Sequence, residues 1–442
     1  MFTRIKVQNY KSLINLDVDF TCKKEKAKPL VVIYGENGVG KSNIASVFYV
    51  LCESLRTMTI RNRLQKLFDN GEEFEKHLDD RLFRFLKENL NGTESIIKNC
   101  KTINSKDNMV LQYDFIVSGG NRGTYIIEYD NNRIVHERLE YVLNKNKTVL
   151  YDLTEQKVQI NKEIFLDNKY EKEFKELLEK YWGKHTLLSL LIFDKEDKIN
   201  NYVEERVNSA LFDIVREFFT MSVEIKNGNR GEKGTLGVRH EILKELEKGE
   251  IDITKEEELN RAERLVNEFF TTAYTDIKEV YYRREYEEDK INYSLVFKKL
   301  EYDMLIDVDA ELESTGTLKL LEIIPYLLMS LDGRTVVIDE IDNGIHDLLL
   351  NNIIENIIES INGQLIITTH NTMLLDSDID PDYLYTFNVD RDARKTLCAI
   401  TEYEDRKHPN KNHRKRYLQG MYGGIPIEQD IDFDELKEIM ER

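Results

Sequence analysis

The sequence has no long apolar run. None of its 442 residues falls in an uninterrupted apolar stretch of the roughly eighteen residues that a membrane-spanning helix needs. Residues 1–13 alternate polar with apolar side chains, which is not the pattern of a signal peptide. We therefore expect a cytoplasmic protein with no membrane partner.

Cysteine is scarce and scattered. The four cysteines are Cys22, Cys52, Cys100 and Cys398, and no two of them have the spacing of a CxxC pair. This spacing indicates neither a zinc site nor a disulfide framework. We expect the cysteines to be small buried apolar residues.

The chain also has fewer basic than acidic residues: 63 Lys and Arg against 82 Asp and Glu, which gives a net charge of −19. A protein coated with positive potential is excluded, so any contact with nucleic acid has to come from a local patch. The one candidate is the basic run at residues 406–416, for which phosphate or partner binding and a merely solvated face are both open interpretations.

What the chain does have is the sequence GENGVGKS at residues 35–42, a complete GxxxxGK[ST] phosphate loop. An apolar run at 30–33 precedes it, and a helix-like stretch at 43–48 follows it. Strand, glycine-rich turn and helix are the context in which backbone N–H groups can surround a β-phosphate. The sequence therefore predicts a nucleotide site, with ATP and Mg²⁺ as cofactors.

Each residue of the loop has an expected role. The glycines permit the close backbone path, Lys41 bridges the β- and γ-phosphates, and the Ser42 hydroxyl ligates Mg²⁺. The nucleotide-contacting residues that we expect here are Gly35, Glu36, Asn37, Gly38, Val39, Gly40, Lys41, Ser42 and Asn43.

The apolar periodicity predicts an α/β fold in three stretches. Residues 1–160 are expected to form the N-terminal part of an ATPase head, with strands at 4–7, 16–20 and 109–151 and helices at 43–57 and 60–91. Residues 161–277 are expected to form a helical insertion, a lid or short arm, with helices at 171–181, 202–221 and 256–274 and a loop at 226–239. Residues 278–442 complete the head.

The apolar strand at 335–338 ends in two adjacent carboxylates, Asp339 and Glu340. This is the form of a Walker B strand, in which Asp339 holds Mg²⁺ through water and Glu340 orients the attacking water. The alternative is a buried strand that happens to end in two acidic residues.

A second buried strand, at 364–369, ends in His370, at the carboxyl edge where α/β sheets place ligands. His370 is expected to hydrogen-bond the γ-phosphate or the water, although a lone histidine is more often structural.

Upstream of both strands, Ser314, Thr315, Gly316 and Thr317 precede an apolar helix at 318–331. Small hydroxyl residues and a glycine at a helix start favour a second anion site. An ordinary helix N-cap gives the same pattern.

These motifs, in this order and together with residues 9–12 at the end of the first strand, resemble the ABC/SMC/RecF class of ATPases over nearly the whole chain. Residues 339–346, 364–376 and above all 414–426 look like the AAA-type ATPases found beside RloB-like proteins and in PARIS-type (AriA-like) anti-phage systems. The resemblance implies an ABC-type head with a RecA-like core, an antiparallel β subdomain and an inserted helical lid or arm.

The same resemblance implies that two heads sandwich two ATP molecules in a homodimer or a higher homo-oligomer. Residues 314–317 of one chain would then complete the phosphate-loop site of the other, and residues 343–347 would make a contact across the dimer. Two features depart from the class: the signature reads STGT instead of LSGGQ, and Gln112 is the only candidate for the Q-loop glutamine.

The function expected from this resemblance is an ATP-driven switch in phage defence that scaffolds or controls a separate toxic effector, such as a neighbour-encoded Toprim or RloB-like nuclease. The alternative is a DNA repair or recombination ATPase of the RecF/SMC kind. A transporter subunit fits less well, because it would carry LSGGQ and a clear Q-loop. An OLD-type enzyme would need a Toprim domain after His370, where only 72 residues follow.

Overall fold

The computed structural model describes residues 1–22, 25–69, 92–143, 145–199, 201–226, 233–238, 240–403, 412–425 and 432–441. Its centre is a seven-stranded sheet in the order β12-β11-β17-β18-β5-β19-β20. The strands are β5 (Leu30–Tyr34), β11 (Ser222–Lys226), β12 (Lys233–Leu236), β17 (Thr335–Ile338), β18 (Gln364–Thr368), β19 (Leu384–Val389) and β20 (Lys395–Ala399). The five inner strands run parallel, and β12 and β20 pair antiparallel at the two edges.

The central sheet separates two hydrophobic cores, as expected of a parallel sheet buried on both faces. Along β5, Val31 and Ile33 belong to one core, whereas Leu30, Val32 and Tyr34 belong to the other. Because successive side chains point to opposite faces, this strand reads as a continuous apolar run in the sequence. All five of its residues are buried.

The first core lies between the central sheet and a second, antiparallel sheet in the order β10-β9-β8-β7-β6-β1-β2. Its strands are β1 (Phe2–Tyr10), β2 (Leu13–Asp19), β6 (Met109–Ile116), β7 (Arg122–Tyr129), β8 (Ile134–Leu143), β9 (Asn146–Thr154) and β10 (Val158–Ile160). A two-stranded ribbon of β3 (Thr21–Cys22) and β4 (Lys26–Ala27) adjoins it. The long helix α1 (Lys41–Asp69) contributes Ile44, Phe48 and Leu51 to this core.

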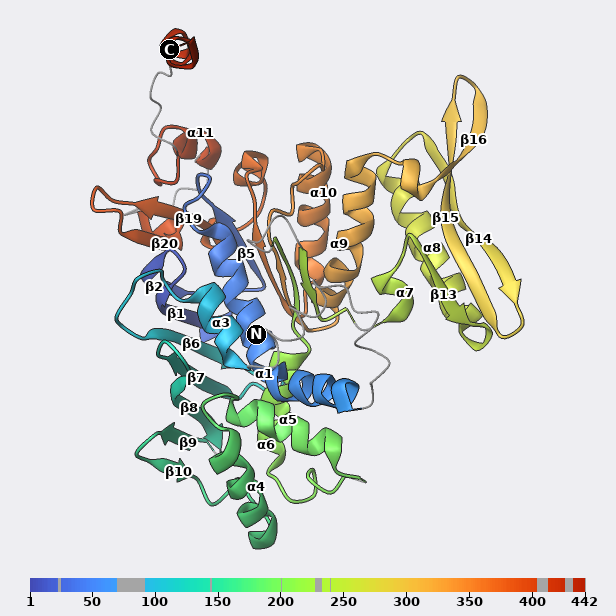
Figure 1. Cartoon of the computed structure of the whole chain (residues 1–442). Coiled ribbons are helices and arrows are strands. Elements are labelled where there is room, and N and C mark those ends of the chain that lie inside the picture. The colour runs from blue at the N-terminus through green and yellow to red at the C-terminus, as the bar shows by residue number, and fades with distance from the viewer. Residues whose placement is uncertain are drawn as a thin grey trace.

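Four further helices complete this side of the molecule: α3 (Thr93–Cys100), α4 (Asn168–Tyr181), α5 (Leu187–Asp197) and α6 (Ser209–Phe219). The last three lie at the bottom of the view in Figure 1. A buried carboxylate joins α5 to the antiparallel sheet. The carboxylate of Glu137 on β8 accepts hydrogen bonds from the Tyr125 and Tyr151 hydroxyls, the Trp182 indole and the backbone N–H of Leu187. Burial raises the pKa of Glu137, and these donors oppose the rise.

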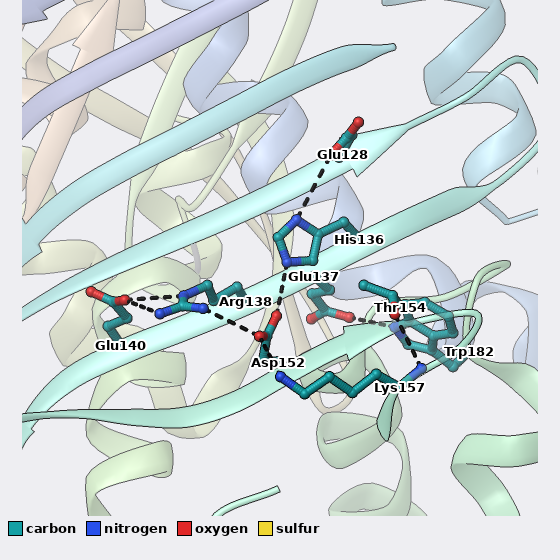
Figure 2. A network of polar contacts seen from close by, with 9 residues as sticks. All are labelled: Glu128, His136, Glu137, Arg138, Glu140, Asp152, Thr154, Lys157 and Trp182. Atoms are coloured by element: carbon teal, nitrogen blue, oxygen red, sulfur yellow. Dashed lines mark hydrogen bonds and ion pairs between the residues drawn. The ribbon is translucent and has the colours of Figure 1, made fainter. Parts of the chain in front are cut away.

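The opposite face of β8 is polar, as the alternation of side chains along a strand requires. Figure 2 shows His136, Arg138 and Glu140 on that face, with Asp152 of β9 between the first two. Asp152 accepts from His136 Nε2 at 2.9 Å and from Arg138 Nη1 at 3.2 Å. The first core therefore lies on one side of this sheet only.

The second core lies under α9 (Thr315–Leu331) and α10 (Asp347–Ile357), which cover the other face of the central sheet. It continues into an outer lobe, drawn in yellow at the right of Figure 1. The lobe contains β13 (Lys248–Asp252), β14 (Ile277–Glu287), β15 (Lys290–Glu301) and β16 (Met304–Asp309), with α7 (Glu241–Lys244) and α8 (Glu256–Ala273) beside them. The chain ends in α11 (His413–Leu418) and α12 (Phe433–Glu441).

The prediction of a helical insertion at 161–277 is wrong in its main feature. Strand β11 lies inside this range and pairs in parallel with the Walker B strand β17, so the range supplies part of the central sheet. Its helices are also divided, because α4, α5 and α6 pack on the first core while α8 belongs to the second. The chain therefore crosses the central sheet in the middle of the supposed lid.

Several local boundaries also differ from the prediction. The helix expected at 202–221 begins only at Ser209, because the Asn208 side chain caps α6 by accepting from the N–H of Ala210. The loop expected at 226–239 includes β12, while residues 227–232 and 239 lie outside the described residues. The helix expected at 60–91 is confirmed as far as residue 69, and 70–91 lie outside. No helix in the described ranges is long and apolar enough to cross a membrane.

Candidate functional site

The phosphate loop joins the end of β5 to the start of α1 at the carboxyl edge of the central sheet. Gly38 and Gly40 have φ angles of 78° and 126°, a region that favours glycine. A side chain is also excluded at Gly35, where a Cβ would lie 2.9 Å from Val39 Cγ1 and 3.0 Å from Phe387 Cβ. The glycine spacing of the motif thus follows from the path of the backbone.

Lys41 is buried, and its ammonium donates to the carbonyl oxygens of Gly35 at 2.7 Å and Glu36 at 3.0 Å. Burial lowers its pKa, while the nearby carboxylates, Asp339 first among them, oppose the fall. The charges of Glu340, Asp342 and Glu36 also raise the pKa of Lys41. The structure therefore brings the predicted phosphate-binding lysine close to the Walker B carboxylates.

The two Walker B carboxylates are held by the neighbouring strand. The Thr368 hydroxyl at the end of β18 donates to Asp339 Oδ1 at 2.6 Å and accepts from the backbone N–H of Glu340 at 2.8 Å. Asp339 is buried, and Glu340 has a φ of 50°, which is unfavourable for a residue with a side chain. Thr368 thus fixes a strained backbone at the position where the strand turns away.

His370 follows β18 at the same edge, and its backbone N–H donates to Asp342 Oδ2 at 2.9 Å. Burial and then Lys41 lower the pKa of the His370 imidazole, whereas Asp342, Glu340 and Asp339 raise it. The net shift of the pKa is downward, which favours the neutral imidazole. The predicted His370 therefore belongs to the same electrostatic cluster as Lys41 and the Walker B pair.

The predicted second anion site begins as an ordinary helix N-cap, because Ser314 Oγ accepts from the backbone N–H of Thr317 at 3.2 Å. Gly316 has a separate role: a Cβ there would lie 2.5 Å from the carbonyl oxygen of Gly344. The segment predicted to contact a partner, 343–347, therefore packs against the signature within one chain. A cavity of about 960 Å³ lined by Thr315, Lys319, Asn343 and Gly344 adjoins both.

Residues 30–376 match the protein family described as "AAA domain, putative AbiEii toxin, Type IV TA system". The chain belongs to this family. The matched range includes the phosphate loop, the signature, the Walker B pair and His370.

Individual relatives of this AAA domain are more distant. The Septu protein PtuA of Bacillus mycoides (strain KBAB4) is 32% identical over 102 residues, a stretch that covers 20% of this chain and only 14% of the relative. The SMC head domain from Thermotoga maritima aligns with 90% of this chain and 98% of its own, at 12% identity and a TM-score of 0.35. The recombination mediator RecF aligns with 90% of this chain and 98% of its own, at 11% identity and a TM-score of 0.37.

The residues of the AAA domain fit the cofactors that its family implies. Gly38 and Gly40 allow the positive-φ backbone path by which loop N–H groups can surround a phosphate. A hydroxyl at Ser42 and a carboxylate at Asp339 are hard oxygen ligands, and Mg²⁺ takes one or two carboxylates together with substrate phosphates and waters. No cluster of three metal-ligating side chains occurs in the described part of the chain.

Three residues at this edge were not singled out from the sequence: Tyr34, Asp342 and Thr368. Asp342 Oδ1 and the Tyr34 hydroxyl are both buried and have no hydrogen-bond partner among the residues described. Burial and the charge of Asp342 contribute to raising the pKa of Tyr34. Two signals in the sequence could have pointed to this group. Asp342 is the third acid in the run Asp339-Glu340-Ile341-Asp342, and Thr368 ends an apolar strand.

The C-terminal segment of the chain, beyond the matched residues 30–376, also reaches the site. Tyr417 of α11 lies over Tyr34, with ring centroids 5.7 Å apart, and its hydroxyl donates to the carbonyl oxygen of Gly424. A Cβ on Gly424 would lie 3.6 Å from Gly35 Cα. The segment on which the narrower resemblance rested is thus packed against the phosphate loop.

The basic run at 406–416 is used in part within the chain. Arg414 donates through Nε to the Thr372 hydroxyl at 3.2 Å, and its guanidinium is 3.9 Å from Asp376. Residues 404–411, including Arg406, Lys407 and Lys411, lie outside the described residues.

Gln112 is not at the site. It lies on β6 of the antiparallel sheet, where its amide donates to Asp114 at 3.1 Å, so the prediction that it is the Q-loop glutamine is wrong.

Proposed function

We propose that this chain binds MgATP at the carboxyl edge of the central sheet, hydrolyses it, and uses the cycle as a conformational switch. The observation that carries the proposal is the convergence of Lys41, Asp339, Glu340, Asp342 and His370. A single lysine among three carboxylates leaves an excess of negative charge that a divalent cation would balance. Mg²⁺ supplies the charge that stabilises a phosphoryl group in transfer.

Each of these residues then has its own role in the reaction. Lys41 exchanges the loop carbonyls for the β- and γ-phosphate oxygens, and Ser42 and Asp339 hold the metal. Glu340 accepts a hydrogen bond from the attacking water and orients it. His370 contacts the γ-phosphate or the same water through its imidazole.

Association of two heads around ATP is the second part of the proposal. The N-terminus of α9, at Ser314, presents backbone N–H groups that suit the phosphates of a partner's nucleotide. The closely packed Gly316–Gly344 contact would make the signature and the 343–347 segment move as one unit. ATP binding and dimerisation are thereby linked.

Sedimentation of variants that retain ATP tests this link. In a Glu340→Gln background, Ser314→Arg should abolish ATP-dependent dimerisation, because the arginine enters the second anion site. The matched control is Asn208→Arg, which removes an N-cap of the same kind from α6, away from the signature. A Ser314→Arg/Glu340→Gln protein that still dimerises with ATP would contradict the sandwich.

The biological setting that we propose is anti-phage defence, in which the switch controls a separate effector protein such as a nuclease. Two observations support it: the description of the matched family as a toxin of a toxin–antitoxin system, and the local similarity to a Septu protein. A DNA repair or recombination ATPase is the second candidate, favoured by the order of motifs shared with the RecF class.

The two candidate functions predict different partners and different activities for the purified chain. In the defence role, the purified chain should not cleave DNA, RNA or tRNA with ATP and Mg²⁺ or Mn²⁺, and a neighbour-encoded protein should co-purify with it. In the repair role, DNA ends should stimulate ATP hydrolysis. Stimulation by DNA ends without a co-purifying protein would favour repair, and cleavage lost on Glu340→Gln would contradict the separate effector.

A further inference from the structure

A second lysine lies beside the phosphate loop, on the side away from the Walker B carboxylates. Lys395 is the first residue of the edge strand β20, and its Nζ donates to the Ser12 hydroxyl oxygen at 2.8 Å. The Asn43 side-chain amide of α1 donates to the same oxygen at 2.8 Å. A Cβ on Gly40 would lie 3.6 Å from Ser12 Oγ and 3.8 Å from Lys395 Nζ. Three segments far apart in the sequence thus meet at one end of the loop.

This group consists of hydrogen-bond donors. The Ser12 oxygen already accepts two hydrogen bonds, so its own hydrogen is left to donate outward. The Lys395 ammonium and the Asn43 amide each keep further N–H groups after their bond to Ser12. Beyond the Ser12 oxygen that two of them share, these amide, hydroxyl and ammonium groups keep hydrogens to donate, and such a group suits an anion.

The charge of Lys395 has no carboxylate to balance it among the described residues. Its side chain is half-buried, and burial lowers its pKa with no carboxylate opposing the fall. The adjacent Arg394 behaves in the ordinary way: it is exposed and its guanidinium is 3.5 Å from Asp392. Partial burial of an uncompensated ammonium is unfavourable unless an anion arrives.

We propose that Lys395, with Ser12 and Asn43, binds the α-phosphate of the nucleotide. This inference rests on the proposed function, and it names the residue that holds the end of the triphosphate opposite to Lys41. The charges of Asp339, Glu340 and Asp342 raise the pKa of both Lys41 and His370. They are not among the causes that shift the pKa of Lys395. Lys41 therefore belongs with the γ-phosphate end, and Lys395 lies beside Gly40 and Asn43 at the nucleoside end.

Equilibrium binding of ATP and of ADP, each with Mg²⁺, tests the proposal. Lys395→Ala should weaken the binding of ATP and of ADP by the same factor, because both carry an α-phosphate. We expect about tenfold, the effect of losing one charge-assisted hydrogen bond. Lys395→Arg should recover most of the loss, since it keeps the charge. The control is Arg394→Ala, which removes an exposed cation from the preceding position and should leave both affinities unchanged.

Three results would overturn the assignment: unchanged affinities in Lys395→Ala, a loss for ATP alone, which would place the lysine at the γ-phosphate, or an equal loss in Arg394→Ala. Thermal unfolding without nucleotide separates binding from a structural role. We expect Lys395→Ala to unfold at the wild-type temperature. A lower temperature with unchanged affinities would mean that Lys395 only ties β20 to Ser12. If the wild-type chain bound neither nucleotide, the proposed function itself would fail, a different outcome from failure at Lys395.

Discussion

Replacing Thr368 by valine tests whether the hydroxyl at the end of β18 positions the Walker B pair. Valine has nearly the same shape, so the change removes two hydrogen bonds and little packing. One bond is to a buried carboxylate at 2.6 Å, and the other is from the backbone of Glu340 at 2.8 Å. A bond to a charged group contributes about 1.5–3 kcal/mol and a neutral one about 1 kcal/mol, so we expect about 2.5–4 kcal/mol less stability.

The turnover number for ATP should fall as well, by about 10–100-fold, the usual effect of losing a residue that orients a metal ligand. Urea unfolding and steady-state ATP hydrolysis measure the two effects. The matched control is Thr335→Val at the other end of the Walker B strand. The Thr335 hydroxyl is buried and has no hydrogen-bond partner within the described ranges, so its loss should be neutral or stabilise by up to about 1 kcal/mol. Equal effects of the two substitutions would refute the reasoning.

Two further predictions concern packing and pH. Gly316→Ala places a Cβ 2.5 Å from the Gly344 carbonyl oxygen and should destabilise the chain by about 1–3 kcal/mol. Gly119→Ala is the control, because a Cβ there has no atom within 4 Å and should not change the stability. Urea unfolding of both variants measures the difference. Burial lowers the pKa of His185 to about 3 from an ordinary 6.5, so below pH 6.5 the unfolded chain takes up a proton that the folded chain refuses. Unfolding free energy should therefore be lost as the pH falls from 6.5 towards 3, by up to about 1.4 kcal/mol per pH unit for this group. His185→Asn should reduce that slope, and an unchanged slope in urea titrations at pH 7, 5 and 4 would contradict the assignment.

The parallel-sheet part of the fold was predictable because its strands are buried on both faces and read as unbroken apolar runs. The phosphate loop and the two apolar strands that end in Asp339 and His370 each carry a local signal. The sequence does not show that these strands are neighbours, but the order β17-β18-β5 places all three carboxyl ends together. The alternating pattern of the antiparallel sheet was equally legible, since one of its faces is polar.

The failures have physical causes of two kinds. Strand β11 is only five residues long and follows closely on α6, so its pairing with β17 depends on tertiary contacts that no local pattern encodes. The roles of Thr368, Asp342 and Lys395 depend on side chains from distant segments meeting at one edge. A lysine at the start of an edge strand looks like any solvated charge until its neighbours are known.

Nucleotide retention and hydrolysis by two variants test the central claim most directly, namely that Lys41 and Glu340 have separate roles in one ATP site. Binding of labelled ATP with Mg²⁺ should be at least tenfold weaker for Lys41→Ala, which loses a charge-assisted contact to the phosphates. Glu340→Gln should bind ATP like the wild-type chain yet hydrolyse it about 10²–10⁴ times more slowly in a single turnover, since it cannot position the water. A Glu340→Gln protein as empty of ATP as Lys41→Ala, or one that hydrolyses ATP at the wild-type rate, would contradict the account.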